Sequence, residues 1–216
     1  MHPLLAVVVL AAAPTPDELV AKVQATYQSA GNLQASFTQT YVDKVRGKKR
    51  LESGTLWAAK DGRVRWSYKK PVKKDFVFTG GTAYFYEPES AQVTVFERFQ
   101  DTPVANALRF LWGQGKLSET FRVEACDEKC KVTVAGDTAL RLWPKEPLAA
   151  VDHLQLIVDP ATGRVRGSIV VDPLGNRSEY AFSEVQFGVP LEDKRFAFEI
   201  PKDVSVLRAT AEAPKK

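Results

Sequence analysis

The feature that most constrains this chain is a long series of short segments, in most of which apolar and polar residues alternate. Successive side chains of a strand point to opposite faces, so a period of two is typical of half-buried strands. Most of these segments are expected to form strands, about eleven or twelve in all. The segments are 36–42, 54–57, 64–68, 76–78, 83–86, 93–96, 121–125, 132–134, 140–143, 154–158, 165–171, 178–185 and 196–200.

Turn residues separate many of these segments, for example at 60–62, 70–71, 80–81, 159–163 and 172–176. Tight turns join antiparallel neighbours. A meander of this length must hide its edges, which favours a highly curved antiparallel sheet that approaches a barrel without closing. Because no linker or change of composition divides the chain, we expect a single domain over residues 14–208 and a polar tail over 209–216.

Two helices are expected beside the sheet. Thr15 can cap the first helix, and Glu18 completes a capping box with it. Leu19, Val23 and Tyr27 then recur at helical spacing on one face. This stripe is expected to pack on the concave side of the sheet, where it can be buried.

The second helix interrupts the strand series after a start signal at 101–103. Val104, Leu108 and Leu111 lie on one face of it. We expect this stripe, like the first, to be buried on the concave face of the sheet.

The first 13 residues have the length of a signal-peptide core and end in three alanines, although they contain no Lys or Arg. The apolar run is too short to cross a bilayer, which needs about 20 residues. We expect export to the periplasm. No Cys follows the run directly, so the chain is not expected to be lipid-anchored itself.

Cys126 and Cys130 are the only cysteines. In an exported protein this spacing favours a small disulfide across a turn. A metal or redox role is the alternative, but two thiols alone make a weak zinc site. We therefore expect a disulfide, no metal and no cofactor.

Two stretches are strongly basic, residues 44–50 and 69–74. They suit solvated loops that discourage edge pairing, or loops that dock on anionic head groups. The net charge of +4 is too small to indicate a nucleic-acid partner, and the basic stretch 44–50 contains no aromatic residue.

Signals of an enzyme are few. Once a signal peptide is removed, His153 is the only histidine, and its alternation with Leu154 and Leu156 suits a strand surface. The chain contains no Gly-x-Ser-x-Gly elbow and no phosphate-binding loop. A hydrolase is the least favoured function, and we expect no enzyme.

Aromatic pairs are more informative than the polar residues. Trp66 and Tyr68 share one strand face, as do other pairs in the neighbouring segments. Core packing is one interpretation. The other is an apolar hollow, because a curved sheet of eleven strands has more inner surface than two short helices can fill.

In the order and spacing of several motifs, the chain resembles the LolA family of periplasmic lipoprotein carriers. The motifs are Leu33-Gln-Ala-Ser-Phe-Thr-Gln39, Gly54-x-Leu-Trp57, Arg65-Trp-Ser-Tyr-x-x-Pro71, Gly80-x-x-x-Tyr-Phe-Tyr-x-Pro88, Asp172-x-x-Gly-Asn176 and Phe196-x-Phe-x-x-Pro201. The resemblance implies an unclosed barrel with a helical lid over an apolar cavity. It also implies a monomer that takes acylated lipoproteins from an inner-membrane ABC transporter and delivers them to an outer-membrane receptor, with no covalent chemistry.

On this resemblance, acyl chains are expected to contact one set of cavity and lid residues. The set is Trp57, Val64, Trp66, Tyr68, Phe76, Phe78, Tyr84, Tyr86, Val104, Leu108 and Leu111. Lys60 aligns with a basic residue, often Arg followed by Pro, that bonds to the lid in the family; a plain turn residue is the alternative. A module of the same fold that senses lipid, binds a partner protein or carries another lipid is the alternative function.

Overall fold

The computed structural model describes residues 14–101, 115–126, 130, 132, 134–148 and 150–210. Its helices are α1 (Pro16–Ser29), α3 (Leu117–Thr120) and the 3₁₀ turns η1 (Pro88–Ser90), η2 (Phe99–Asp101) and η4 (Asp193–Phe196). Its strands are β1 (Leu33–Val42), β2 (Lys49–Ala58), β3 (Val64–Lys70), β4 (Lys74–Phe78), β5 (Ala83–Glu87), β6 (Gln92–Glu97), β7 (Phe121–Ala125), β8 (Thr138–Pro144), β9 (His153–Val158), β10 (Val165–Val171), β11 (Arg177–Phe187) and β12 (Ser205–Thr210).

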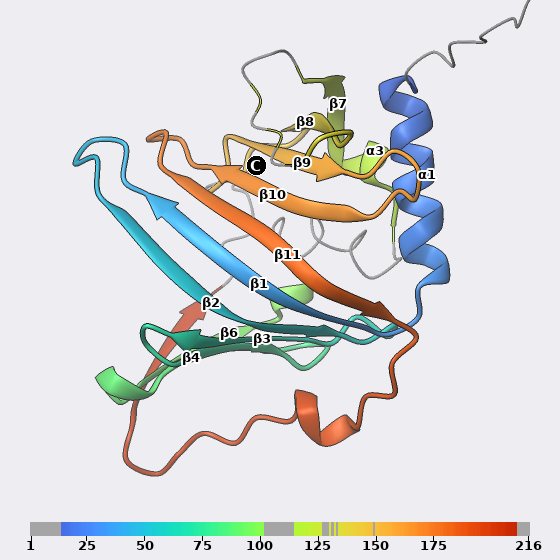
Figure 1. Cartoon of the computed structure of the whole chain (residues 1–216). Helices are drawn as coiled ribbons and strands as arrows, with labels where there is room; N and C mark the ends of the chain where they lie inside the picture. The colour runs from blue at the N-terminus through green and yellow to red at the C-terminus, as the bar shows by residue number, and fades with distance from the viewer. Residues whose placement is uncertain are drawn as a thin grey trace, which may run out of the picture.

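The described strands form one sheet of twelve in the order β12-β6-β5-β4-β3-β2-β1-β11-β10-β9-β8-β7. The sheet is strongly curved and does not close, and α1 runs along one end of it (Figure 1). This confirms the expected curved sheet. All neighbouring strands are antiparallel except β12, which pairs with β6 in parallel.

The helix α1 forms where the sequence predicts it. The Thr15 hydroxyl accepts a hydrogen bond from the Glu18 amide, and the Glu18 carboxylate accepts one from the Thr15 amide, which completes the capping box. Leu19, Val23 and Tyr27 are buried against the sheet. The turn between β9 and β10 binds another side of α1, where Lys22 Nζ donates to the carbonyl oxygen of Pro160 at 2.7 Å.

The two faces of the sheet have different covers. The inner, concave face carries the main core, which includes Leu19 and Val23 from α1 together with Phe37 of β1. The outer face of β3–β6 has a smaller core of its own. The chain from η4 to β12 crosses that face, and Phe196 and Val77 are fully covered there.

Three expected boundaries are corrected by the structure. Residues 197–200 form no strand, because Phe196 and Phe198 pack on the outer face instead of extending a ladder. The strand expected at 132–134 is not formed at its described residues 132 and 134. The strand β12 reaches Thr210, so the expected tail begins inside it. Residues 1–13 and 211–216 lie outside the described part.

Candidate functional site

An apolar pocket lies on the inner face at the end next to α1. Its lining comes from α1, β1, β2, β3, β10 and β11. The lining residues are Tyr27, Leu33, Ala35, Leu56, Ala58, Val64, Trp66, Val165, Phe182 and Val185. None of these described residues is charged, and the cavity between them has a volume of only about 40 Å³. Ligand pockets usually span roughly 300–1,000 Å³, so a ligand of ordinary size needs this site to open.

Two residues supply the polar atoms of this lining. The Tyr27 hydroxyl accepts a hydrogen bond from the backbone amide of Val165 at 3.2 Å, which ties α1 to β10. Burial of the hydroxyl raises the pKa of Tyr27 to about 12. The indole Nε1 of Trp66 is buried without a hydrogen-bond partner among the described residues.

An aromatic cluster fills the inner face beside the pocket. The Phe37 ring meets the rings of Trp66 and Tyr68 edge-on, with centroids 5.2 and 4.9 Å apart. Trp66 also contacts Tyr180 at 5.4 Å and Phe182 at 6.2 Å. Because these rings occupy the space next to the pocket, their displacement is the most direct way to enlarge it.

Beyond the rings, the inner face becomes polar. Tyr68 donates a hydrogen bond to Gln39 Oε1 at 2.7 Å, and Lys74 Nζ donates to Glu52 Oε1 at 2.8 Å. The Glu52 side chain is only 5 % exposed, and its Oε2 is buried without a partner among the described residues. The inner face therefore runs from apolar near α1 to polar and charged at the other end of β1 and β2.

A second group of rings lies on the inner face of β4–β6. The Phe99 ring stands 5.5 Å from Phe76, 5.3 Å from Phe78 and 6.3 Å from Phe96. Phe99 begins η2, directly before residues 102–114. The structure thus places both phenylalanines of β4 where the sequence expects them, next to the chain that leads toward the expected lid.

The strand β3 follows the expected alternation. Val64 and Trp66 line the pocket, and Tyr68 joins the cluster on the same face. Arg65 points to the outer face, where its Nη2 lies 2.9 Å from Asp75 Oδ2. Contact of any of these residues with lipid stays a prediction.

Three expected cavity residues lie on the wrong face. Trp57 pairs with Arg65 across the sheet and packs under the Arg195 guanidinium, 4.5 Å from its ring centroid. Tyr84 and Tyr86 pack on Phe198, with centroids 4.9 and 5.8 Å apart. The expectation that these three line the hollow is wrong, because the segment from η4 onward covers the outer face and gives these rings a second place to be buried.

Lys60 sits in the exposed turn between β2 and β3, and its backbone amide donates to Asn32 Oδ1 at 3.1 Å. Val104, Leu108 and Leu111 lie outside the described residues. A bond from Lys60 to the lid therefore stays a prediction.

Sequence reasoning missed several pocket residues on β1, β2 and β11. Phe182 and Val185 are three apart yet face one pocket, because a bulge shifts the β1–β11 register and Glu184 takes a positive φ of 51°. Ala35 and Ala58 also line the pocket. Ala35 alternates with Leu33 and Phe37 on the buried face of β1, and only this alternation could have pointed to it.

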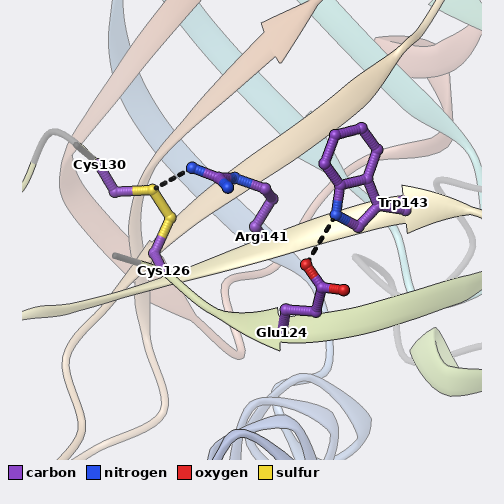
Figure 2. The surroundings of a disulfide bond; sticks show 5 residues. All are labelled: Glu124, Cys126, Cys130, Arg141 and Trp143. Atoms are coloured by element: carbon purple, nitrogen blue, oxygen red, sulfur yellow. Dashed lines mark hydrogen bonds between the residues drawn. A yellow bond between two sulfur atoms is a disulfide. The ribbon is translucent and has the colours of Figure 1, made fainter. Parts of the chain in front are cut away.

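The two cysteines are bonded in the structure, with Cα atoms 5.8 Å apart, just after β7. Figure 2 shows Arg141 donating to the Cys130 sulfur at 3.5 Å, while the Trp143 indole donates to Glu124 at 3.0 Å. This group lies on the outer face, away from the pocket. The disulfide in the isolated protein stays a prediction.

Comparison with known proteins agrees with this geometry. The sequence profile described as "Outer membrane lipoprotein carrier protein LolA" matches residues 28–199. The chain belongs to the LolA family. Two relatives, both named outer-membrane lipoprotein carrier protein, are from Chromohalobacter salexigens, 29% identical over 87% of this chain and 85% of theirs, and Methylococcus capsulatus, 28% identical over 86% and 85%.

A solved structure of an uncharacterized conserved protein from Thermus thermophilus has a related fold. Its TM-score is 0.53 at 13% identity, over 89% of this chain and 98% of that one. Among the described residues, no helix is long and apolar enough to span a membrane, and no three His, Cys, Asp or Glu side chains gather as metal ligands.

Proposed function

We propose that this LolA-family protein is a periplasmic carrier that holds the acyl chains of lipoproteins in its inner hollow and moves them from the inner to the outer membrane. The observation that carries the proposal is the uncharged lining of the pocket under α1. The names of the relatives support it, since they are carriers of outer-membrane lipoproteins. An inner-membrane ABC transporter is the proposed donor, and an outer-membrane receptor the proposed acceptor.

Burial supplies the affinity. Each methylene removed from water contributes about 0.8 kcal/mol, so a chain of about sixteen carbons gains roughly 12 kcal/mol before costs. The closed cavity of about 40 Å³ reduces this gain, because the rings of Trp66 and Phe182 must first move. A carrier has to release its cargo. Side chains that return to fill the empty pocket favour release of the acyl chain.

The proposed acyl contacts are Val64, Trp66, Tyr68, Phe76 and Phe78, completed by Val104, Leu108 and Leu111 of the expected lid. Trp66 has a further role in this scheme. Its unpaired indole N–H can donate to an ester or amide carbonyl at the head of an acyl chain, which removes the cost of an unmet donor.

The test is capture of an acylated lipoprotein released from inner-membrane vesicles by protein purified from the periplasm. Val185→Glu places a charge in the half-buried rim of the pocket and should abolish capture while the fold persists. Gln186→Glu is the matched control, because the same charge lies one residue further along β11 on the exposed face. Equal capture by the two variants would contradict the proposed site.

A further inference from the structure

Three turns at one edge of the sheet each expose an apolar side chain at the tip. Val45 between β1 and β2 is 86% exposed, Val72 between β3 and β4 is 37% exposed, and Leu174 between β10 and β11 is 73% exposed. The strand pairing brings these turns to the same edge, opposite α1 (Figure 1). We call residues 43–50, 69–74 and 172–176 the hairpin edge.

The hairpin edge is also strongly basic. These three turns carry nine Lys and Arg against two Asp, and the β5–β6 turn at the same edge adds only Glu87 and Glu89. The whole chain has a net charge of +4, so the rest of the chain beyond the three turns is net negative. Six exposed lysines there form no ion pair with another described residue. They are Lys44, Lys48, Lys49, Lys69, Lys70 and Lys73.

The two aspartates do not neutralise these lysines. Asp43 accepts from the Arg46 amide at 2.8 Å, and Asp172 accepts from the Asn176 side chain at 2.8 Å. Both carboxylates thus hold their own turns in shape. The hairpin edge presents ordered turns with exposed ammonium groups around apolar tips.

Protection of a sheet edge does not explain these charges. The outermost strands of the described sheet are β12 and β7, whereas all three turns connect strands inside the sheet. Exposed apolar side chains at the tips would also oppose such a role, because they invite contact.

We propose that the hairpin edge docks on the surface of an anionic lipid bilayer. The tips Val45, Val72 and Leu174 enter the head-group layer, and the lysines lie against lipid phosphates. The three tips lie in three separate turns along this edge, and a flat partner can contact all of them at once. Docking in this way is separate from cargo binding and would occur in the cargo-free protein.

Docking by the hairpin edge sets which end of the inner face of the proposed carrier meets the bilayer. The strands β1 and β2 run from the hairpin edge to the apolar pocket, and the polar pair Gln39 and Glu52 lies between the two. A docked molecule therefore turns the polar end of its inner face to the bilayer and keeps the apolar end under α1.

The experiment is co-sedimentation of protein purified from the periplasm with vesicles of phosphatidylcholine, alone or mixed equally with phosphatidylglycerol. The parent should bind the anionic vesicles, and added salt should weaken binding. Changing Lys44, Lys48, Lys70 and Lys73 together to Gln should weaken it roughly 600-fold, since each is worth roughly fivefold. The same four changed to Arg should bind like the parent.

Changing the three tips Val45, Val72 and Leu174 to Ser should weaken binding about tenfold. The matched control changes Ile200, Val206 and Leu207 to Ser, which are exposed aliphatic residues on or before β12. Equal binding of these two variants, or a parent that ignores anionic lipid, would overturn the proposal. The proposal would also be overturned by a tip variant that binds vesicles normally yet fails to exchange cargo with detergent-solubilised membrane proteins. In that case the tips would contact a partner protein and not the bilayer.

Discussion

Replacing Tyr27 by Phe should change how the stability of the protein depends on alkaline pH. The Tyr27 hydroxyl is the acceptor for the Val165 amide, and its ring packs edge-on against Phe187 with centroids 5.7 Å apart. Phenylalanine keeps the ring contact but leaves a buried N–H unpaired, which costs about 1–3 kcal/mol. Near neutral pH, the variant should be less stable than the parent by that amount.

Alkaline pH should remove this difference. Burial raises the pKa of Tyr27 to about 12, whereas an unfolded tyrosine titrates near 10. A raised pKa means that folding favours the neutral hydroxyl, so its stabilisation is complete below about pH 10 and is lost between about pH 10 and 12. With about 1.4 kcal/mol for each unit of pKa, the parent loses roughly 3 kcal/mol of stability there that the variant cannot lose.

The assay is urea denaturation of both proteins, followed by tryptophan fluorescence, at a series of pH values from neutral upward. Burial also raises the pKa of Tyr68 and Tyr180, but these residues are present in both proteins and cancel in the difference. The free-energy gap should narrow steadily above about pH 10. Two profiles that stay parallel would refute the reasoning about Tyr27.

Three other outcomes are expected. The hydrogen bond from the Thr162 hydroxyl holds the pKa of Asp159 below its usual value. The Asp159 carboxylate therefore stabilises the fold above its unfolded pKa, and this stabilisation is lost as pH falls through the folded pKa. Asp159→Asn should flatten the acid side of a plot of stability against pH. Phe198→Ala should cost about 2 kcal/mol in denaturant unfolding without changing cargo capture, because the ring packs on the outer face. Unreduced protein should have no titratable thiol, and changing Cys126 and Cys130 to Ser should cost about 2 kcal/mol for so short a loop.

Local signals were sufficient to predict most of the fold. The capping box of Thr15 and Glu18 fixes the start of α1, and alternation with tight turns fixes the hairpins of the sheet. The pairing of β12 with β6 could not be predicted in this way. The pairing depends on which edge of the sheet β12 reaches after the preceding segment has crossed the outer face, and tertiary contacts decide that.

Assignment of faces was harder than assignment of strands. Phe76, Val77 and Phe78 form an unbroken apolar run, which indicates burial on both faces of a strand. The residues of β5 before Glu87 form another run without a charged residue, so Tyr84 could lie on either face of the sheet. Its pairing with Val77 places it on the outer face. That unbroken run was the available signal of the outer core, and an inner hollow alone could not account for it.

The placement of β1 beside β11 sets the order in which the molecule can form. Leu33 pairs with Phe187, so the middle of the sheet joins segments from near the two ends of the described chain. Such distant pairing costs loop-closure entropy before it gains contacts, and sheets built this way fold slowly. The β2–β6 meander and the β7–β10 meander consist of strands adjacent in the chain, so each can form early. The pocket is complete only when β11 has paired with β1, because Phe182 and Val185 of β11 form part of its lining.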